Sequence, residues 1–258
     1  MSHRSHSTMV RHPDHKNPSR KPSGQAPSVP VDVGGRELDA RRAERLQTRQ
    51  LLQGGRTPLQ VLAVAEQATT RAEHAITEAK RDYPPPALAC QEGCDWCCHL
   101  RVGTAVPEVY RIVQYLRHTL SPAELQATQE RIVRLDEQRR QIRAGKRGLA
   151  RLPCALLVER RCSAYPVRPL TCRGFNSTDA HQCELFLELG KKVTVPSYAP
   201  QFRLPTFVLD GMRAGLAEAG LKGDLLELTA ALRIAFEVPD AFERWLAGEA
   251  VFAPARLD

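Results

Sequence analysis

Apolar residues recur every three or four positions over most of the chain after residue 57, a spacing typical of helices that bury one face. The first such stretch opens at a capping box formed by Thr57 and Gln60, with Pro58 at the first helical position. It predicts a helix of about 25 residues that ends at the three prolines 84–86. Small residues dominate its inner face, which favours close packing against a neighbour: Ala65, Ala68, Ala72, Ile76 and Ala79.

Two more helices are predicted after the first cysteine-rich segment. The first carries one apolar stripe: Val109, Ile112, Val113, Leu116 and Leu120. Ser121 and Glu124 form a second capping box, with Pro122 at the first helical position, and open a helix over about residues 122–144. We expect these two helices to be antiparallel.

Helical spacing also appears before residue 57 and in the C-terminal third of the chain. Residues 36–52 have few apolar positions and predict a charged helix that ends at Gly54 and Gly55. Three further stripes, at 207–220, 224–236 and 239–246, predict helices in the C-terminal third. These helices are expected to provide packing rather than chemistry.

The helical pattern is interrupted between Leu152 and Cys183. The letters ALLV, ERR and CSAY predict two short strands joined by a turn, and Pro166 and Pro169 prevent a helix from forming before residue 170. The predicted fold class is therefore mainly α: a helical domain with a loop-rich, cysteine-rich metal-binding centre and one short β-hairpin.

The chain is predicted to consist of a disordered basic tail (1–35), a charged helix or linker (36–56) and a helical domain (57–258) whose cysteine-cluster core covers 88–185. The tail is rich in Pro and Ser and has too few apolar residues to offset its ordering entropy. Its histidines are candidate metal ligands, but a mobile solvated tail is the favoured interpretation: His3, His6, His12 and His15.

Neither a transmembrane run nor the apolar core of a secretory signal is found in the sequence, so we expect a cytoplasmic protein without membrane contact. The net charge is +8, and half of it lies in the first 30 residues. A second basic stretch covers 122–151 and could bind RNA, DNA or an acidic protein. A solvated helix face is favoured, because no aromatic residues are interleaved with the basic ones to stack on bases and the whole chain is only 5% aromatic. The basic positions are Arg131, Arg134, Arg139, Arg140, Arg143, Lys146, Arg147 and Arg151.

Eight cysteines lie in two groups. The first is the run CQEGCDWCC, with Cys90, Cys94, Cys97 and Cys98, and the second is Cys154, Cys162, Cys172 and Cys183. In a reducing cytoplasm, clustered thiols indicate metal binding or catalysis rather than a disulfide framework. Isolated cysteines often fill a core instead, but that does not suit two adjacent cysteines flanked by two more.

The first group cannot lie on one continuous helix and bind one ion. Its sulfurs would face one side but spread over about 12 Å, whereas zinc holds sulfur at about 2.3 Å. Gly93 disfavours a helix, so we expect a loop up to this residue and a helix from near Asp95. Amides at that helix start would favour thiolates.

Thiolate ligation suits zinc or an iron-sulfur cluster, and eight cysteines suffice for two sites or for one site with spare thiols. Zinc sites often use repeated pairs with a two-residue spacer, and only Cys94 and Cys97 have that spacing, so an iron-sulfur cluster, in the 4Fe-4S form, is favoured over zinc. CxxxCxxC is also the spacing of radical S-adenosylmethionine enzymes, but no alternating strands and helices follow it. Arginines near the cysteines could offset the charge of such a site: Arg101, Arg160, Arg161, Arg168 and Arg173.

CxxxCxxCC, followed by Cys154 and by CxxYxxRPxxCRxF from Cys162 to Phe175, resembles the YkgJ-like cysteine cluster family. This family is described as zinc- or iron-chelating and includes flagellin lysine N-methylase. The resemblance covers about residues 88–185 and implies binding of a metal or cluster. The family's name-giving form has two residues between its first two cysteines, whereas three separate Cys90 from Cys94 here.

Three polar residues of this pattern are candidates for the site. Tyr165, Arg168 and Arg173 are predicted to support it by hydrogen-bonding sulfurs or holding the loop around the cofactor; the alternative is that Tyr165 and Arg168 orient a substrate or cofactor carboxylate. His99 and His181 are close to cysteines and could replace one as ligand, but surface histidines are the favoured interpretation.

Three functions remain open. The favoured one is a metal-binding protein in which thiolates from both segments hold an iron-sulfur cluster or zinc, structurally or for sensing. The second is an S-adenosylmethionine-dependent protein lysine N-methyltransferase, with a protein substrate, like the methylase relative. The third is docking of RNA or an acidic protein on the basic helix, although the composition disfavours nucleic acid. The sequence determines neither the catalytic residues, if any, nor the oligomeric state.

Overall fold

The computed structural model describes residues 33–142, 146 and 150–257. Residues 1–32 of the predicted disordered tail, with its four histidines, lie outside the described residues, as do Arg143 and Arg147 of the basic stretch; residues 33–35, predicted as tail, are instead the start of a helix. The described part is mainly helical with two small antiparallel sheets, which confirms the predicted fold class.

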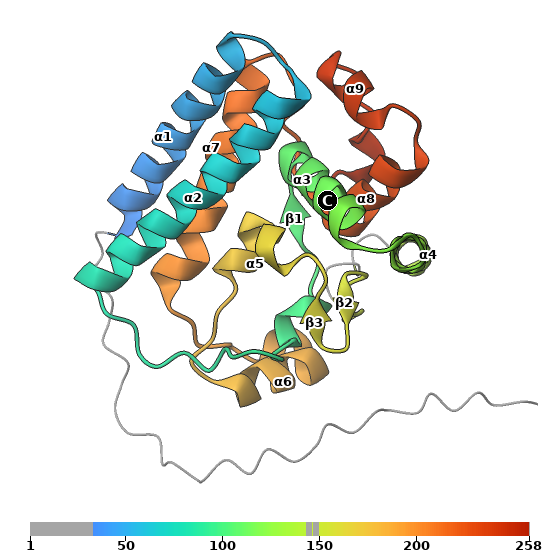
Figure 1. Cartoon of the computed structure of the whole chain (residues 1–258). Coiled ribbons are helices and arrows are strands. Elements are labelled where there is room, and N and C mark those ends of the chain that lie inside the picture. Colours follow the sequence, from blue (N-terminus) through green and yellow to red (C-terminus); the bar gives the residue numbers. More distant parts are fainter. Residues whose placement is uncertain (1–32, 143–145, 147–149, 258) are drawn as a thin grey trace, which may run out of the picture. The chain divides into compact units, whose positions relative to one another are not determined.

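The helices and strands are connected mostly by short loops (Figure 1). The α-helices are α1 (Val33–Gln53), α2 (Pro58–Asp82), α3 (Val106–Thr119), α4 (Pro122–Gln141), α5 (Leu170–Gly174), α6 (Ala180–Leu189), α7 (Ala199–Glu218), α8 (Leu228–Glu237) and α9 (Ala241–Leu246). The strands are β1 (Gly103–Thr104), β2 (Leu157–Val158), β3 (Arg161–Cys162) and β4 (Leu226–Glu227), and the 3-10 turns are η1 (Trp96–His99), η3 (Tyr165–Val167), η4 (Gly190–Lys192) and η5 (Ala253–Ala255).

Helices α1, α2 and α7 pack against one another on one side of the molecule (Figure 1). The predicted capping box of α2 is present: the amide of Gln60 donates to Oγ1 of Thr57 (3.3 Å), and the amide of Thr57 donates to Oε1 of Gln60 (3.0 Å). The small inner face is buried as predicted: Ala65, Ala68, Ala72, Ile76 and Ala79.

The charged helix α1 lies along α7 at backbone contact distance. A Cβ atom at Gly211 of α7 would come within 2.4 Å of the Arg41 carbonyl oxygen, so a larger residue does not fit there. The carboxylate of Glu44 is fully buried and accepts from Nε and Nη2 of Arg71 in α2 (2.6 and 2.9 Å) and from Oγ1 of Thr48. A buried charge needs such partners, so these contacts fix the position of a helix that has few apolar side chains.

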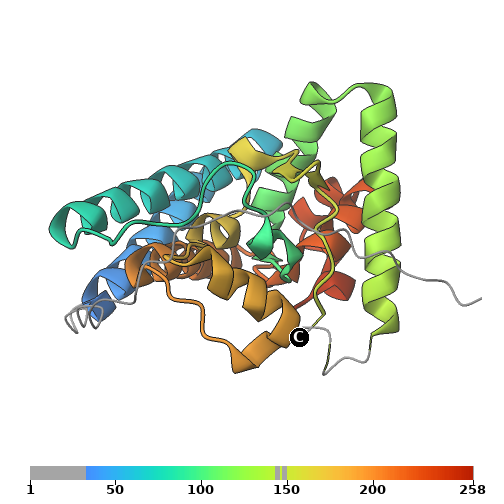
Figure 2. The ribbon, with the colours of Figure 1, turned by 90° about the horizontal axis from the view of Figure 1, so that it is seen from below.

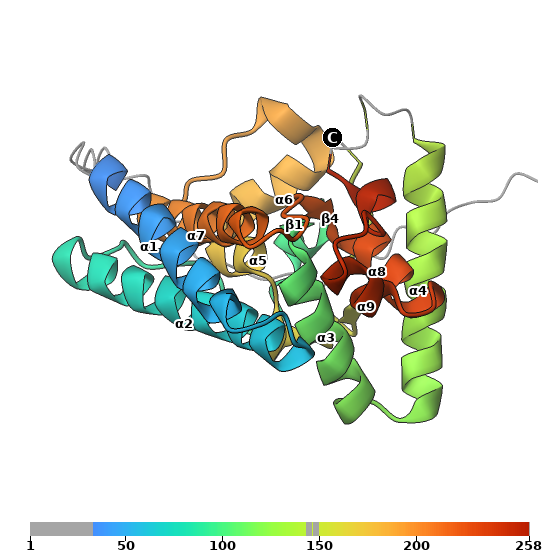
Figure 3. The ribbon, with the colours of Figure 1, turned by 90° about the horizontal axis from the view of Figure 1, so that it is seen from above.

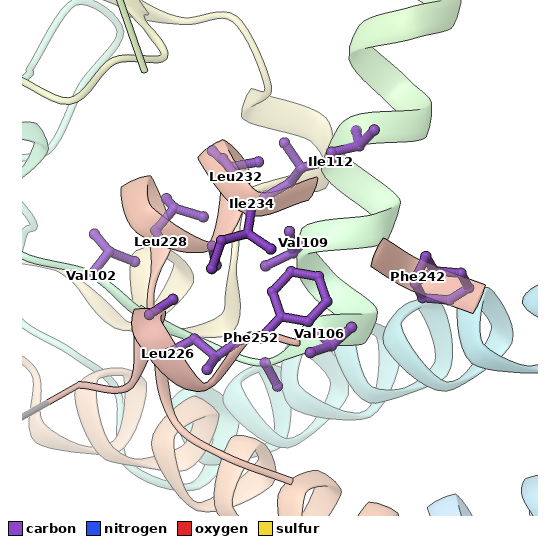
Figure 4. Close-up of a cluster of buried hydrophobic side chains, with 14 of the residues drawn as sticks. Val102, Val106, Val109, Ile112, Leu226, Leu228, Leu232, Ile234, Phe242 and Phe252 are labelled. Carbon is purple, nitrogen blue, oxygen red and sulfur yellow. The ribbon is translucent and has the colours of Figure 1, made fainter. Parts of the chain in front are cut away.

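Helices α3 and α4 both pack on α8, which lies between them (Figure 3). The predicted capping box of α4 is present, with the amide of Ser121 donating to Oε2 of Glu124 (2.8 Å). Strand β1 pairs with β4 just before α8, a long-range pair that no local pattern predicted. The buried side chains in Figure 4 come mainly from these elements: Val106, Val109 and Ile112 of α3, Leu226 of β4, and Leu228, Leu232 and Ile234 of α8. Within the described residues, none of the helices has the length and apolarity needed to cross a lipid bilayer.

A buried carboxylate connects this core to the second cysteine segment. Oε2 of Glu108 accepts from Oγ1 of Thr104 (2.9 Å) and the amide of Ala105 (3.0 Å), and Oε1 accepts from the amide of Leu170 (2.7 Å). Burial raises the pKa of the Glu108 carboxyl, while these three donors and the more distant Arg173 favour its charged form. Glu108 therefore holds the start of α3 and the start of α5 together, and α5 carries Cys172.

We expect Glu108→Ala to lower the free energy of unfolding by about 3 kcal/mol or more, because it leaves two buried amides without an acceptor. Glu124→Ala is the matched control, since this residue has the same position in an exposed capping box and should cost much less. Urea unfolding of both variants measures the difference, and equal losses would show that the link to α5 contributes nothing.

Candidate metal centre

The first cysteine segment makes a tight turn before a single helical turn. The amide of Cys94 donates to the carbonyl of Gln91 (3.0 Å), and Gly93 between them has a φ of +80°, which glycine adopts without strain. The helix expected from near Asp95 is only the four-residue 3-10 turn η1. Leu100 is already extended, with a ψ of 157°, because the chain leads directly into β1. Because η1 is a single turn, its dipole favours thiolates less than the start of the expected longer helix would.

The second segment contains the predicted hairpin. Strand β2 pairs with β3, and Leu157 lies opposite Cys162. Glu159 and Arg160 form the turn with φ values of +48° and +63°, the left-handed pair that suits a two-residue hairpin loop. Cys154 lies just before β2, because the amide of Leu157 donates to its carbonyl (3.0 Å). Cys154 and Cys162 therefore lie at the same end of the hairpin.

Hydrogen bonds and ion pairs join the two cysteine segments, which are distant in the sequence. The amide of Cys154 donates to the carbonyl of Cys98 (2.8 Å), and the amide of Ala89 donates to the carbonyl of Ser177 (2.8 Å). Helix α6, which carries Cys183, packs against η1 (Figure 2).

Two arginines of the hairpin reach carboxylates of the first segment. Arg160 pairs with the buried Asp95 (3.4 Å) and Arg161 pairs with the exposed Glu92 (3.1 Å). All four cysteines of each segment are free of disulfides. The structure therefore brings both groups of cysteines to the same region of the molecule.

The thiols influence one another electrostatically. Burial and, to a lesser extent, neighbouring thiols raise the pKa of Cys154 to about 11 and that of Cys172 well above its usual range. Cys97 is the exception: a hydrogen bond from the Cys98 thiol lowers its pKa, and the Arg168 guanidinium adds to this effect. The same contact raises the pKa of Cys98. Several thiolates cannot gather here without a cation to offset their repulsion.

Three cysteines have a hydrogen bond from the backbone two residues ahead. Burial raises the pKa of Cys94, Cys154 and Cys162, but backbone contacts of Trp96, Leu156 and Ala164, respectively, oppose this rise. A backbone contact that lowers a thiol's pKa has to be an N–H directed at the sulfur, because an N–H stabilises the thiolate. Donors of this kind tune sulfur ligands in metal sites.

The three predicted supporting residues lie around the loop that connects Cys162 to Cys172. The buried guanidinium of Arg173 donates to the carbonyls of Arg168 (3.1 Å) and Pro166 (2.7 Å) and pairs with Glu73 of α2. Arg168 stacks over the exposed ring of Tyr165, with 3.9 Å from its Cζ to the ring centroid, and its charge favours the thiolates of Cys97 and Cys162. Their role as supports of a bound cofactor stays a prediction.

The two histidines near cysteines have other neighbours. Nδ1 of His99 lies 3.2 Å from the Asp95 carbonyl, and Nδ1 of His181 lies 3.4 Å from Oε2 of Glu184. Sequence reasoning missed the contributions of Asp95 and Ser177. The position of Asp95 between Cys94 and Cys97 was a signal for the first, but nothing local indicated that Ser177 would contact the first segment.

Across residues 33–142, 146 and 150–257, no group of three or more His, Cys, Asp or Glu side chains is arranged closely enough to hold a metal ion. The thiols share one region, and their side chains would have to turn toward one another to bind one ion. The donor set itself fits zinc or iron, because both metals accept thiolate ligands.

Residues 89–190 match the model of the CxxCxxCC family, which is described as a "putative zinc- or iron-chelating domain". This range contains all eight cysteines and confirms the family resemblance found in the sequence. The segment is therefore similar to a cysteine-rich domain that is described as zinc- or iron-chelating. Comparisons with curated proteins and with solved structures gave no match to the chain.

We expect Arg173→Lys to destabilise the metal-free protein by about 2 kcal/mol, because an ammonium group cannot replace a planar guanidinium that bonds two carbonyls and a carboxylate. Alkylation of Cys172 should also become faster. Arg161→Lys is the control, since this arginine is exposed and pairs with the exposed Glu92; it should change little. Urea unfolding and mass spectrometry of alkylated peptides measure both effects. Similar results for the two variants would mean that Arg173 does not clamp the loop.

Proposed function

We propose that this chain is a metal-binding protein that holds an iron-sulfur cluster, in the 4Fe-4S form, through thiolates from both cysteine segments. The observation that carries the proposal is the hydrogen bond from the amide of Cys154 to the carbonyl of Cys98, which holds the two segments side by side. A ligand set drawn from both segments requires this arrangement.

The surroundings of the sulfurs support thiolate ligation. Amides face the sulfurs of Cys94, Cys154 and Cys162, and the Arg168 guanidinium lies within electrostatic reach of Cys97 and Cys162. Hydrogen bonds and positive charge stabilise thiolates and set the potential of an iron-sulfur cluster. The preference for a cluster over zinc rests on spacing, since Cys94 and Cys97 are the one pair separated by two residues.

A bound cluster would also stabilise the least regular part of the fold. Between α2 and α3, and again between β3 and α6, the described chain consists of turns, strands of two residues and the five-residue helix α5. A metal that joins four thiolates adds its binding free energy to the stability of such a region. A structural or sensing role follows from this, in a cytoplasm that keeps the thiols reduced.

The contacts of the basic helix favour a binding module over docking of RNA or an acidic protein. On the basic helix, Arg139 pairs with Glu227, Arg140 pairs with Asp136, and Arg131 donates to the carbonyl of Ala155. These arginines are engaged within the protein.

Anaerobic purification followed by iron, sulfide and zinc analysis tests the proposal. We expect iron and acid-labile sulfide in equal amounts, with a broad visible absorption that bleaches on reduction. Cys98→Ser should lower the iron content. His181→Ala, which removes a side chain near Cys183 that is paired with Glu184, should keep it. Zinc without sulfide would contradict the cluster, and protein without either metal would contradict metal binding altogether.

A further inference from the structure

The eight thiols are not evenly surrounded, and the differences divide them into two sets. The outer set is Cys90, Cys94, Cys97 and Cys183, and the inner set is Cys98, Cys154, Cys162 and Cys172. Cys90 is the most exposed of the eight. By contrast, three members of the inner set pack against the hydrophobic core: Cys154, Cys162 and Cys172.

Ser177 brings the ends of the outer set together. Its carbonyl accepts from the amide of Ala89 (2.8 Å) and from the thiol of Cys90 (3.9 Å), and its side chain lowers the pKa of the Cys183 thiol. The turn at Gly93 then returns the chain so that Cys94 and Cys97 lie near these two residues. The packing of α6 on η1 brings Cys183 toward Cys97.

The inner set is assembled by different contacts. The bond from the amide of Cys154 to the carbonyl of Cys98 joins the first two members, and the hairpin register brings Cys162 to the end where Cys154 lies. Cys172 follows on α5, whose start is held by Glu108 and whose preceding loop is held by Arg173. The inner set therefore depends on the core, whereas the outer set depends on α6 and Ser177.

Mutual effects of the thiols follow this division except at Cys97, which, after burial, raises the pKa of Cys90 and Cys183 in the outer set and of Cys162 and Cys172 in the inner set. After burial, the thiols that raise the pKa of Cys94 are Cys90, Cys97 and Cys183, which complete the outer set. Burial likewise raises the pKa of Cys172, and Cys154 and Cys162 of the inner set raise it further, as does Cys97. Cys97 therefore lies at the boundary, next to Cys98 in the sequence and in contact with its thiol.

We propose that the chain holds two metals, one bound by the outer set and one by the inner set, with the Cys97–Cys98 peptide bond joining the two sites. Each site takes one thiophilic ion or one iron-sulfur core through four thiolates. This inference rests on the proposed metal-binding function and assigns the ligands of each site. Because the inner set packs against the core and Cys90 is exposed, the outer site loses its metal to a chelator first.

Cobalt(II) is a suitable probe, because its bonds to thiolates absorb light and their number can be counted during a titration. The reduced, metal-free full-length chain is titrated with cobalt(II) under anaerobic conditions. We expect the thiolate-to-cobalt absorption to rise to an end point at two equivalents. A chelator should then remove the metal in two phases of equal amplitude.

Single variants assign the phases. Cys183→Ser should lower the end point from two equivalents to one and remove the fast phase, and Cys90→Ser should do the same. Their double variant should still bind one equivalent, because both residues belong to one site. Cys183→Ser combined with Cys172→Ser should bind none, and the circular dichroism of each variant shows whether it remains folded. The assignment rests on the two outer variants if Cys172→Ser does not fold.

The outcomes separate this inference from the proposed function. An end point at one equivalent in the wild-type chain would overturn the two-site assignment and leave the proposed metal binding intact. Loss of both equivalents in the double variant of Cys90 and Cys183 would show that these residues belong to different sites, which also overturns it. If the wild-type chain binds no cobalt, both the assignment and the proposed function are wrong.

Discussion

The hydrogen bond between the amide of Cys154 and the carbonyl of Cys98 connects two segments that have little regular structure of their own. Around it, two ion pairs and the bond from Ala89 to Ser177 hold the same segments together. Without these contacts the two groups of cysteines would be separate short motifs. With them, eight thiols occupy one region. Bringing several thiolates together there costs free energy, and a bound cation lowers this cost because it offsets their repulsion.

The helices provide the rigid side of this arrangement. The core between α3 and α8 fixes the start of α3. Glu108 of α3 accepts a hydrogen bond from the amide of Leu170 and thereby holds the start of α5 next to it. Arg173 adds a second link, from the loop after Cys162 to Glu73 of α2. The inner cysteines are thus held by buried polar contacts on both sides, while Cys90 and Cys183 are held mainly by Ser177 and α6. This difference is the physical basis for two sites of unequal accessibility.

Elements with strong local signals could be predicted from the sequence. The capping boxes at Thr57 and Ser121, the alanine face of α2 and the hairpin at Glu159 all depend on residues a few positions apart. Other features depend on distant residues and could not. The pair β1–β4 has two residues per strand, and α7 begins at Ala199 and continues through Pro205, a residue that normally ends a helix.

In the candidate site, too, local features could be predicted from the sequence and long-range contacts could not. Cysteine spacing and composition identified the eight thiols, but the chain direction after Cys98 was misjudged, because entry into β1 limits η1 to one turn. Partners such as Ser177 and Glu73 come from far along the chain, so no spacing rule indicates them. The division of the thiols into two sets also depends on these long-range contacts.

The most direct test of the central claim is cross-linking of the metal-free protein with a short reagent that alkylates two thiols, such as dibromobimane. Trypsin places the first four cysteines in the peptide 82–101 and the others in the peptides 152–160, 162–173 and 174–191, because the bond between Arg168 and Pro169 resists cleavage. Mass spectrometry should find peptide 82–101 linked to each of the other three. If all thiols react and links form only within single peptides, the two segments do not converge and the account is wrong.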